Sequence, residues 1–158
     1  MKDVKIRKAT IEDLKVILEM QSLMTAEERK FMKGLAKKGK MVSYLESEIK
    51  AILSSSKCYF TIAETQGKPI GCGFARIEKF HGDWSKYRKY GYLGLLYIVK
   101  EHRRRGIATA LQKERVRWLK SKGIKICVNK IFANNRPAIT LQEKRGFKPY
   151  IVKMYKII

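Results

Sequence analysis

The sequence predicts a single α/β domain in which helices cover one mixed sheet. Segments with the two-residue period of strands alternate with segments that have the 3.6-residue period of helices. No internal repeat or low-complexity tract interrupts them, and the 158 residues suffice for one hydrophobic core but not for two. The expected element order is β-α-α-β-β-β-α-β-α-β, within one domain that covers residues 1–158.

The first half of the chain predicts a strand, two helices and a hairpin. Residues 4–7 form the strand, and Thr10 then begins a helix with Asp13 at the capping-box position. A second helix is indicated by the apolar stripe from Val42 to Leu53. After a serine-rich break, CYFTIAE and IGCGFARIEKF flank a QGKP turn, which predicts an antiparallel hairpin.

The second half alternates strands with helices. Residues 92–99, YLGLLYIV, are nearly all apolar and predict a buried strand. We then expect a helix to about Lys122, a strand over residues 124–133, a short helix capped by Asn135, and one or two strands over residues 148–158.

Net charge is the extreme feature of the composition. Lys and Arg number 36 against 14 Asp and Glu, which gives +22. Such a field attracts polyanions, including RNA, DNA and acidic proteins. The alternative is a generally lysine-rich proteome, because the lysines are spread along the chain. The N-terminus lacks the apolar core of a signal peptide, and no apolar run approaches the ~20 residues of a membrane span. We therefore expect a cytoplasmic protein without membrane contact.

The cysteines do not suggest a metal site. Cys58, Cys72 and Cys127 are far apart, no C-x-x-C occurs, and the two histidines are His81 and His102. This pattern favours buried free thiols over a zinc centre, so no metal is expected.

A candidate phosphate site lies in EHRRRGIATAL, residues 101–111. It follows the predicted buried strand and begins a helix, whose first N–H groups lack intrahelical acceptors and favour anions. Gly106 allows close approach of the backbone, Ala108 keeps the entrance open, and the three preceding arginines supply positive charge. Neither a Walker A sequence nor G-x-G-x-x-G occurs in the chain.

Two motifs in the right order resemble those of the GNAT superfamily, the GCN5-related N-acetyltransferases. R-x-x-G-x-A, Arg103 to Ala108, looks like motif A. NRPAITLQEKRGF, Asn135 to Phe147, is similar to motif B, N-x-x-A-x-x-L-Y-x-K-x-G-F. The resemblance implies the GNAT fold, with a mixed sheet of six to seven strands, a splayed strand pair and about four flanking helices.

The resemblance also implies acetyl-CoA as the cofactor. The turn amides would hold the pyrophosphate, and backbone groups at Leu96 and Ile98 would pair with the pantetheine arm. In this family the motif A strand carries a bulge and diverges from the next strand, so that the thioester enters the gap. Asn135 would contact the cofactor, cap its helix, or both. The residues implied at the cofactor are Leu96, Tyr97, Ile98, Arg103, Arg104, Arg105, Gly106, Ile107, Ala108, Thr109 and Asn135.

Acetyl transfer to an amine needs a base more than an acid. A free lysine amine has a pKa of ~10.4, whereas an ordinary thiol leaves with a pKa of ~8.5. The developing oxyanion needs a donor, which we expect to be a backbone N–H of the splayed strand. By resemblance, the base position early on the motif A strand is Tyr92. The alternative base is Glu78, near the end of the hairpin, acting through a water.

The sequence departs from the motifs at two points. Motif B usually carries a tyrosine, a candidate acid for the thiolate, where this chain has Gln142. Tyr97, Tyr150 or water would replace it, or catalysis is weak or lost. In the helix after the turn, Glu114 and Arg115 fall within an apolar stripe. We leave open whether they are exposed with buried stems or form a subunit interface.

The resemblance therefore predicts an acetyl-CoA-dependent N-acetyltransferase acting on a protein N-terminus, a lysine or a small amine, by direct attack in a ternary complex. The alternative is a basic protein with the GNAT fold, bound to nucleic acid or ribosomes, that acetylates an RNA-linked amine or has lost catalysis. Residues 30–40 and 80–90 are the candidate acceptor mouth, and their cations favour an acidic or RNA-linked acceptor. A monomer and a homodimer both remain open.

Overall fold

A computed structural model describes residues 3–31, 38–81 and 85–154, and for residues 38–44 it describes the backbone alone. The strands and helices are β1 (Val4–Lys8), α1 (Leu14–Glu28), α2 (Lys38–Ser54), β2 (Cys58–Thr65), β3 (Lys68–Lys79), β4 (Lys89–Ile98), α3 (Ile107–Ser121), β5 (Cys127–Val128) and α4 (Arg136–Glu143). Short 3₁₀ turns lie at Ile11–Asp13, Arg29–Phe31 and Lys100–His102.

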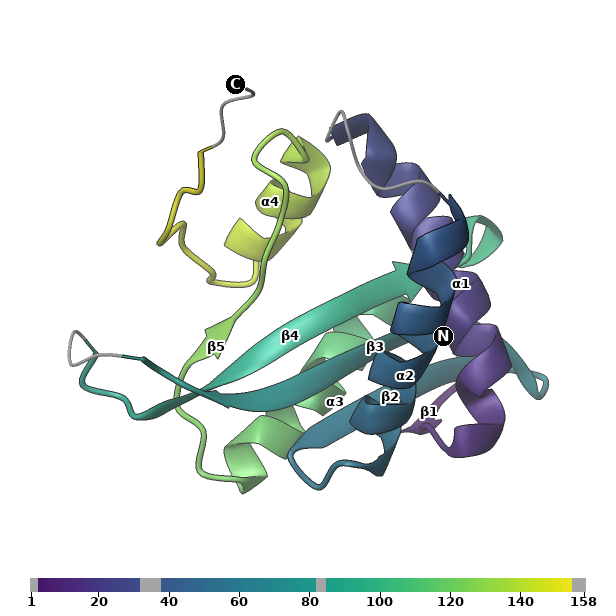
Figure 1. Ribbon diagram of the computed structural model, residues 1–158, viewed down its shortest axis with the longest axis horizontal. Coiled ribbons are helices and arrows are strands. Elements are labelled where there is room, and N and C mark those ends of the chain that lie inside the picture. Colours follow the sequence, from purple (N-terminus) through teal and green to yellow (C-terminus); the bar gives the residue numbers. More distant parts are fainter. Residues whose placement is uncertain (1–2, 32–37, 82–84, 155–158) are drawn as a thin grey trace.

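The strands form one sheet in the order β1-β2-β3-β4-β5. The first four strands are antiparallel neighbours, and β5 runs parallel to β4. Helices α1 and α2 lie on one face of the sheet, α3 lies on the other, and α4 follows β5 at one end (Figure 1). The predicted hairpin is confirmed, with Gln66 and Gly67 in its turn.

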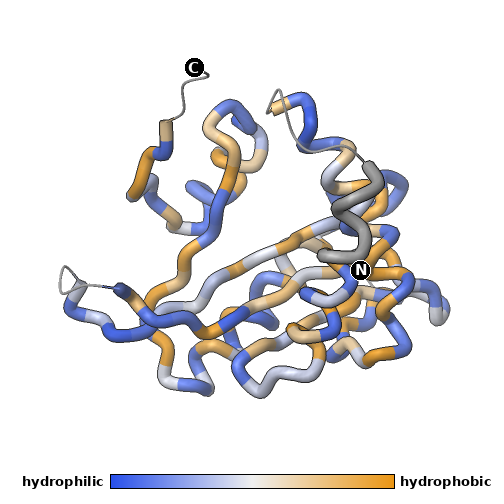
Figure 2. The backbone as a smooth tube through the Cα atoms, in the orientation of Figure 1, coloured by the Kyte–Doolittle hydropathy of each residue, from blue (hydrophilic) through white to orange (hydrophobic). Residues whose placement is uncertain are grey.

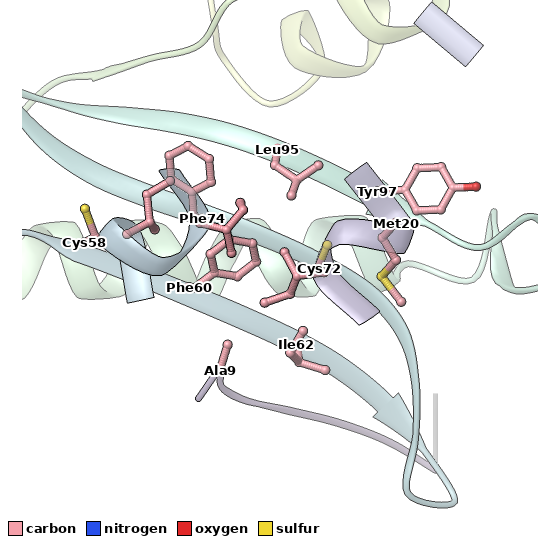
Figure 3. Close-up of a cluster of buried hydrophobic side chains, with 12 residues drawn as sticks. Ala9, Met20, Cys58, Phe60, Ile62, Cys72, Phe74, Leu95 and Tyr97 are labelled. Atoms are coloured by element: carbon pink, nitrogen blue, oxygen red, sulfur yellow. The ribbon is translucent and has the colours of Figure 1, made fainter. Parts of the chain in front are cut away.

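The core has a layer on each face of the sheet. The larger layer joins α1 and α2 to the strands (Figure 3), and it contains Ile17, Met20, Ile49, Ile52, Phe60, Ile62, Cys72, Phe74, Leu95 and Tyr97. The opposite layer is built around Ile107, Leu111 and Leu119 of α3. The predicted stripe of the second helix is confirmed at Ile49 and Ile52, whereas the side chain of Val42 lies outside the described residues.

The prediction of six to seven strands is not confirmed, because the described residues form five. The strand expected over residues 124–133 is reduced to Cys127–Val128. Residues 148–154 form no strand, and the side chains of Val152 and Met154 are 78% and 92% exposed. A two-residue β5 offers little edge for a further strand. The rest of the predicted segment, residues 155–158, lies outside the described residues.

A buried carboxylate joins the first strand to the turn before α1. Asp13 accepts two hydrogen bonds of 2.8 Å from Arg7 and one of 2.8 Å from the backbone N–H of Thr10. Arg7 also donates to Glu64 on β2 at 2.7 Å. The Arg7 guanidinium lowers the pKa of Asp13 against the opposing effect of burial. The predicted capping role of Asp13 is thus confirmed, with an ion pair added.

Asp13→Asn should lower the free energy of unfolding by about 2 kcal/mol, because a charged acceptor of hydrogen bonds is lost. Since the pKa of Asp13 is lower in the folded state, its contribution is full above the unfolded pKa of about 3.9 and is lost as pH falls through the folded value. Urea titrations between about pH 6 and 3 measure both effects. Glu12→Gln, at the exposed neighbouring position, is the control. Equal losses in the two variants would contradict the assignment.

Candidate active site

The turn between β4 and α3 has the geometry of an anion cradle. Strand β4 ends at Ile98, and α3 begins at Ile107 after Gly106, which has a left-handed φ of 77°. Ile107 and Leu111 are buried against the sheet, which fixes the direction of the helix start. The first N–H groups of α3 therefore point out of the helix at a place where the backbone lacks a Cβ.

The three arginines before Gly106 have different surroundings. Arg103 donates to Glu27 of α1 at 2.7 Å and to the Ile98 carbonyl at 2.9 Å, and its guanidinium lies 5.3 Å from the ring centre of Tyr97. Hydrogen bonding from Arg103 lowers the pKa of Glu27. Arg104 and Arg105 are exposed beside the turn. Positive charge beside the helix start thus comes chiefly from Arg104 and Arg105.

The edge of β4 beside the cradle is unpaired in the described part of the chain. Strand β5 pairs with β4 only at Gly91 and Tyr92. Beyond this point the chain turns away toward α4 (Figure 1). Backbone groups alternate in direction along a strand, and the Val99 N–H donates to β3 at 3.0 Å. The backbone groups of Leu96 and Ile98 therefore face the free edge. The predicted splayed pair is present.

Strand β4 also carries the expected bulge. Phe74 of β3 opposes Gly94 and Gly73 opposes Leu96, so that Leu95 is an extra residue. Its φ of 23° lies in a region that leucine rarely adopts. The bulge allows Tyr92, Leu95 and Tyr97 to pack on the α1–α2 face.

Arg115 lies beneath this bulge. Its side chain is 1% exposed and its Nη1 contacts the carbonyl oxygens of Phe74 at 3.0 Å, Gly94 at 2.9 Å and Leu95 at 3.4 Å. Neither alternative left open for Arg115, an exposed side chain or a contact with a second subunit, holds, because α3 packs this position onto the sheet of the same chain. Glu114 accepts from Tyr59 at 3.2 Å and pairs with Arg117 at 2.9 Å. In the sequence, the burial of Arg115 was indicated by its position within the apolar stripe of the helix.

A polar cluster lies on the α1–α2 face at the end of the hairpin. Glu78 accepts from the Nη2 of Arg76 at 2.6 Å and from the Tyr90 hydroxyl. Burial opposes ionisation of Glu78, but hydrogen bonds from Tyr90 and Arg76 lower its pKa below the usual value. The bond to Glu78 also raises the pKa of Tyr90 to about 12. Glu78 is therefore a carboxylate at neutral pH.

Tyr92 lies beside this cluster. Its ring centre is 6.1 Å from that of Phe74, 5.6 Å from the Arg76 guanidinium carbon and 5.5 Å from the Lys130 ammonium. Burial raises the pKa of the Tyr92 hydroxyl, so the hydroxyl stays protonated at neutral pH and is a weak proton acceptor.

Tyr97 lies further along the strand and is 5% exposed. Its hydroxyl is 3.4 Å from Glu27, and burial raises its pKa. Tyr150, the other tyrosine considered as an acid, is 54% exposed in the segment after α4.

Helix α4 is attached to α3 by polar side chains. Asn135 accepts from the Ala138 N–H at 3.3 Å, which confirms its role as N-cap. Gln112 donates to Gln142 at 3.2 Å and accepts from Arg145. Arg145 also donates to the Thr109 hydroxyl at 2.8 Å. Gln142 thus holds α4 against α3, and the side chain of Thr109 is engaged in the same network.

The three cysteines are partly or fully buried thiols. Burial raises the pKa of Cys72 to about 12, and it also raises the pKa values of Cys58 and Cys127. Among the described residues, no group of three or more His, Cys, Asp or Glu side chains is placed to bind a metal. No described helix combines the length and apolar character of a membrane span.

The candidate acceptor mouth is described in part. Phe80 and Tyr90 pack together on the hairpin with ring centres 4.5 Å apart. Residues 32–37 and 82–84, which include Trp84, lie outside the described residues. A hollow of about 320 Å³ is lined by Lys86, Tyr87, Arg88, Lys89, Lys122, Gly123, Ile124 and Lys125. The lysine- and arginine-rich segment after residue 84 is visibly hydrophilic (Figure 2).

The match of a known family model covers both motifs that the sequence analysis singled out. The model of the acetyltransferase (GNAT) family matches residues 20–147, which include the cradle turn and Asn135. Among curated proteins, N-alpha-acetyltransferase 30 of Schizosaccharomyces pombe is 37% identical over 60 residues. That match covers 38% of this chain and 40% of the yeast protein.

Solved structures share the fold over almost the whole chain. A predicted acetyltransferase from Clostridium acetobutylicum, solved with acetyl-CoA, has a TM-score of 0.80 and 19% identity, with 98% of this chain and 96% of that chain covered. The aminoglycoside 6′-N-acetyltransferase AAC(6′)-Ig from Acinetobacter haemolyticus has a TM-score of 0.76 and 19% identity, with 98% and 99% covered. These likenesses concern the fold.

Proposed function

Because this chain belongs to the acetyltransferase (GNAT) family, we propose that it transfers an acetyl group from acetyl-CoA to a primary amine by direct attack in a ternary complex. The acceptor is a protein N-terminus, a lysine or a small amine. The observation that carries the proposal is the left-handed Gly106 at the start of α3, directly beside the unpaired edge of β4. An anion cradle next to a free strand edge suits a long ligand with a pyrophosphate and an amide-bearing arm.

The residues of the turn fit this ligand. The N–H groups from Arg104 to Thr109 would hold the pyrophosphate, with charge from Arg104 and Arg105. The edge at Leu96 would receive the pantetheine arm. The Ile98 carbonyl accepts from Arg103 in this structure, so it would serve the arm only if Arg103 shares it or moves. Asn135 would border the cofactor as well as cap α4.

Acetyl-CoA supplies an acyl carbon that is already activated as a thioester. The chain's task is to remove a proton from the acceptor ammonium, so that the neutral amine can attack, and to stabilise charge on the acyl oxygen. The new bond joins the amine nitrogen to the acyl carbon, the carbon–sulfur bond breaks, and the sulfur departs as a thiolate. A backbone N–H of the splayed edge would stabilise the oxygen. Tyr97, protonated because burial raises its pKa, is the proposed proton donor for the sulfur in place of Gln142.

Electrostatics favour Glu78 over Tyr92 as the base. A base must be deprotonated in the free enzyme, and the lowered pKa of Glu78 meets this condition at neutral pH. The raised pKa of Tyr92 does not. Glu78 would take the proton through a water, while Tyr92 lines the path of the acceptor.

Calorimetry with acetyl-CoA, followed by a free-thiol assay with a panel of amines, tests the function. We expect acetyl-CoA to bind with micromolar affinity and thiol release to depend on an added amine. The absence of acetyl-CoA binding, together with tight and salt-sensitive RNA binding, would leave the nucleic-acid module as the better account.

The basic hollow at Lys86–Lys89 and Lys122–Lys125 favours a second candidate, in which the acceptor is acidic or linked to RNA. None of its lining side chains is a carboxylate, and they include four lysines and an arginine. Bound phosphate groups would offset the mutual repulsion of these positively charged side chains.

Reversing Lys89, Lys122 and Lys125 to Glu should weaken RNA binding by at least about tenfold and reduce the salt slope by roughly two to three, because three phosphate contacts are lost. The control reverses three exposed lysines elsewhere, at positions 8, 15 and 68, with the same change in net charge. Filter binding across a salt series measures both. If the two triple variants behave alike, net charge rather than this hollow attracts RNA.

A further inference from the structure

Three carbonyl groups around the bulge in β4 are contacted by one buried side chain. The extra residue, Leu95, interrupts the ladder opposite Gly73 and Phe74. The Thr61 hydroxyl donates to the Gly73 carbonyl at 2.8 Å. The carbonyls of Phe74, Gly94 and Leu95 all face one guanidinium nitrogen of Arg115. Buried carbonyls need such donors, because an unsatisfied one is costly.

The surroundings are shaped around this guanidinium. The Nε of Arg115 donates back to the Leu111 carbonyl at 3.3 Å, which anchors the side chain on its own helix. A Cβ at Gly73 would lie 2.6 Å from the Leu95 carbonyl oxygen and 2.9 Å from the Arg115 Nη1. Only glycine at position 73 leaves room for this arrangement.

The buried charge has no acidic partner among the described residues. The hydrogen-bond partners of Arg115 are backbone carbonyls, whose dipoles stabilise the guanidinium charge. Burial lowers the pKa of Arg115 to about 10, so it remains charged at neutral pH. An apolar side chain would fill the same space without the cost of desolvating a charge. The buried arginine is therefore better explained by its hydrogen bonds to the carbonyls at the bulge than by a contribution to core packing.

When Arg115 holds a carbonyl group in place, it also fixes the direction of the N–H group in the same peptide unit. In a trans peptide the N–H points away from the preceding C=O. Because the Leu95 carbonyl faces Arg115 and α3, the N–H of Leu96 points away from α3. The alternation of backbone groups along β4 also directs it to the free edge. The left-handed φ of Leu95 is strained, so this orientation persists only if something holds it.

We propose that Arg115 is a positioning residue for acetyl transfer: by holding the Gly94 and Leu95 carbonyls toward α3, it fixes the Leu96 N–H as the donor for the charge on the acyl oxygen. This inference rests on the proposed function. Arg115 itself touches neither substrate. Its effect on the reaction is confined to the orientation of two peptide groups.

The test compares Arg115→Met and Arg115→Lys with Arg117→Met, a control at an exposed position of the same helix. We expect kcat to fall by about 30- to 100-fold in Arg115→Met, because a preorganised donor is lost. The dissociation constant of CoA should stay within about twofold, because the cradle is untouched. Arg115→Lys should be intermediate, and the control should match the wild type. The carbonyl stretch of bound acetyl-CoA should shift to higher frequency most strongly in Arg115→Met, less in Arg115→Lys, and not in the control.

Amide resonances of Leu95 and Leu96 in the ligand-free protein provide a readout that is independent of activity. They should move in both Arg115 variants and not in the control. A wild-type protein that binds no acetyl-CoA would overturn the proposed function, whereas unmoved amides would overturn the role of Arg115 alone. A kcat that falls no further than in the control would also overturn it. If Arg115→Met does not fold, Arg115→Lys decides, since it keeps the charge but loses the fork of donors.

Discussion

Gly106→Val is expected to weaken acetyl-CoA binding by at least about 100-fold, which corresponds to about 2.7 kcal/mol. Gly106 has a φ of 77° at the start of α3. A branched Cβ would oppose this conformation and occupy the surface that the pyrophosphate must approach. Two or more charge-assisted hydrogen bonds from the turn amides would be lost together, each contributing about 1.5–3 kcal/mol. Isothermal titration calorimetry with acetyl-CoA measures the loss.

Gly123→Val is a matched control for this variant. Gly123 follows the other end of α3 with a φ of 73°, and no atom lies within 4 Å of the place a Cβ would take. Both substitutions should therefore lower the stability by about 1–2 kcal/mol through backbone strain alone. Only Gly106→Val should lose the ligand. Equal affinity in the two variants would show that the turn does not hold the pyrophosphate.

Glu78→Gln is expected to reduce kcat/KM by about 100-fold or more, because loss of a general base costs 10²–10⁴ in rate. The affinity for CoA should not change. Tyr92→Phe should retain most of the activity, because its protonated hydroxyl is a poor base. Glu48→Gln is the control. The Oε1 of Glu48 lies 4.0 Å from the Nη1 of Arg76, but this carboxylate is on the more exposed surface of α2. If Tyr92→Phe lost the activity and Glu78→Gln kept it, the roles of the two residues would be reversed.

The pH dependence of kcat/KM shows whether Glu78 acts as the base itself or affects the reaction only indirectly. Hydrogen bonding from Tyr90 helps to lower the pKa of Glu78. Tyr90→Phe should therefore raise the pKa of Glu78 and move the acidic limb of the kcat/KM profile to higher pH. The profile is measured with an amine of low pKa, so that protonation of the acceptor does not mask this limb. An unmoved limb would mean that Glu78 does not titrate in the reaction.

The geometry of the turn between β4 and α3 could be predicted from the sequence because its parts are local. A buried strand, a glycine with positive φ and the first amides of a helix lie within residues 98–109, and their chemistry depends on neighbours in the chain. The N-cap role of Asn135 is local for the same reason.

Contacts between distant segments could not be predicted in this way. Arg103 meets Glu27, 76 residues earlier, and Arg115 meets Phe74, 41 residues earlier. The strand predicted over residues 148–158 is absent in its described part, residues 148–154, for a related reason. Residues 148–154 are rich in β-formers, but a strand needs an edge to pair with, and β5 is two residues long. Whether such an edge exists is decided by the divergence of β5 from β4, which no local pattern records.

The raised pKa values of the three cysteines limit how an acetyl group could travel. A protein thiol accepts an acyl group as a thiolate, and burial disfavours that form in Cys58, Cys72 and Cys127. Burial thus disfavours each of the three cysteines as a carrier of the acetyl group between two substrates. This fits the proposed direct transfer, in which donor and acceptor are bound together, and at low concentrations of both the rate should then follow the product of the two concentrations.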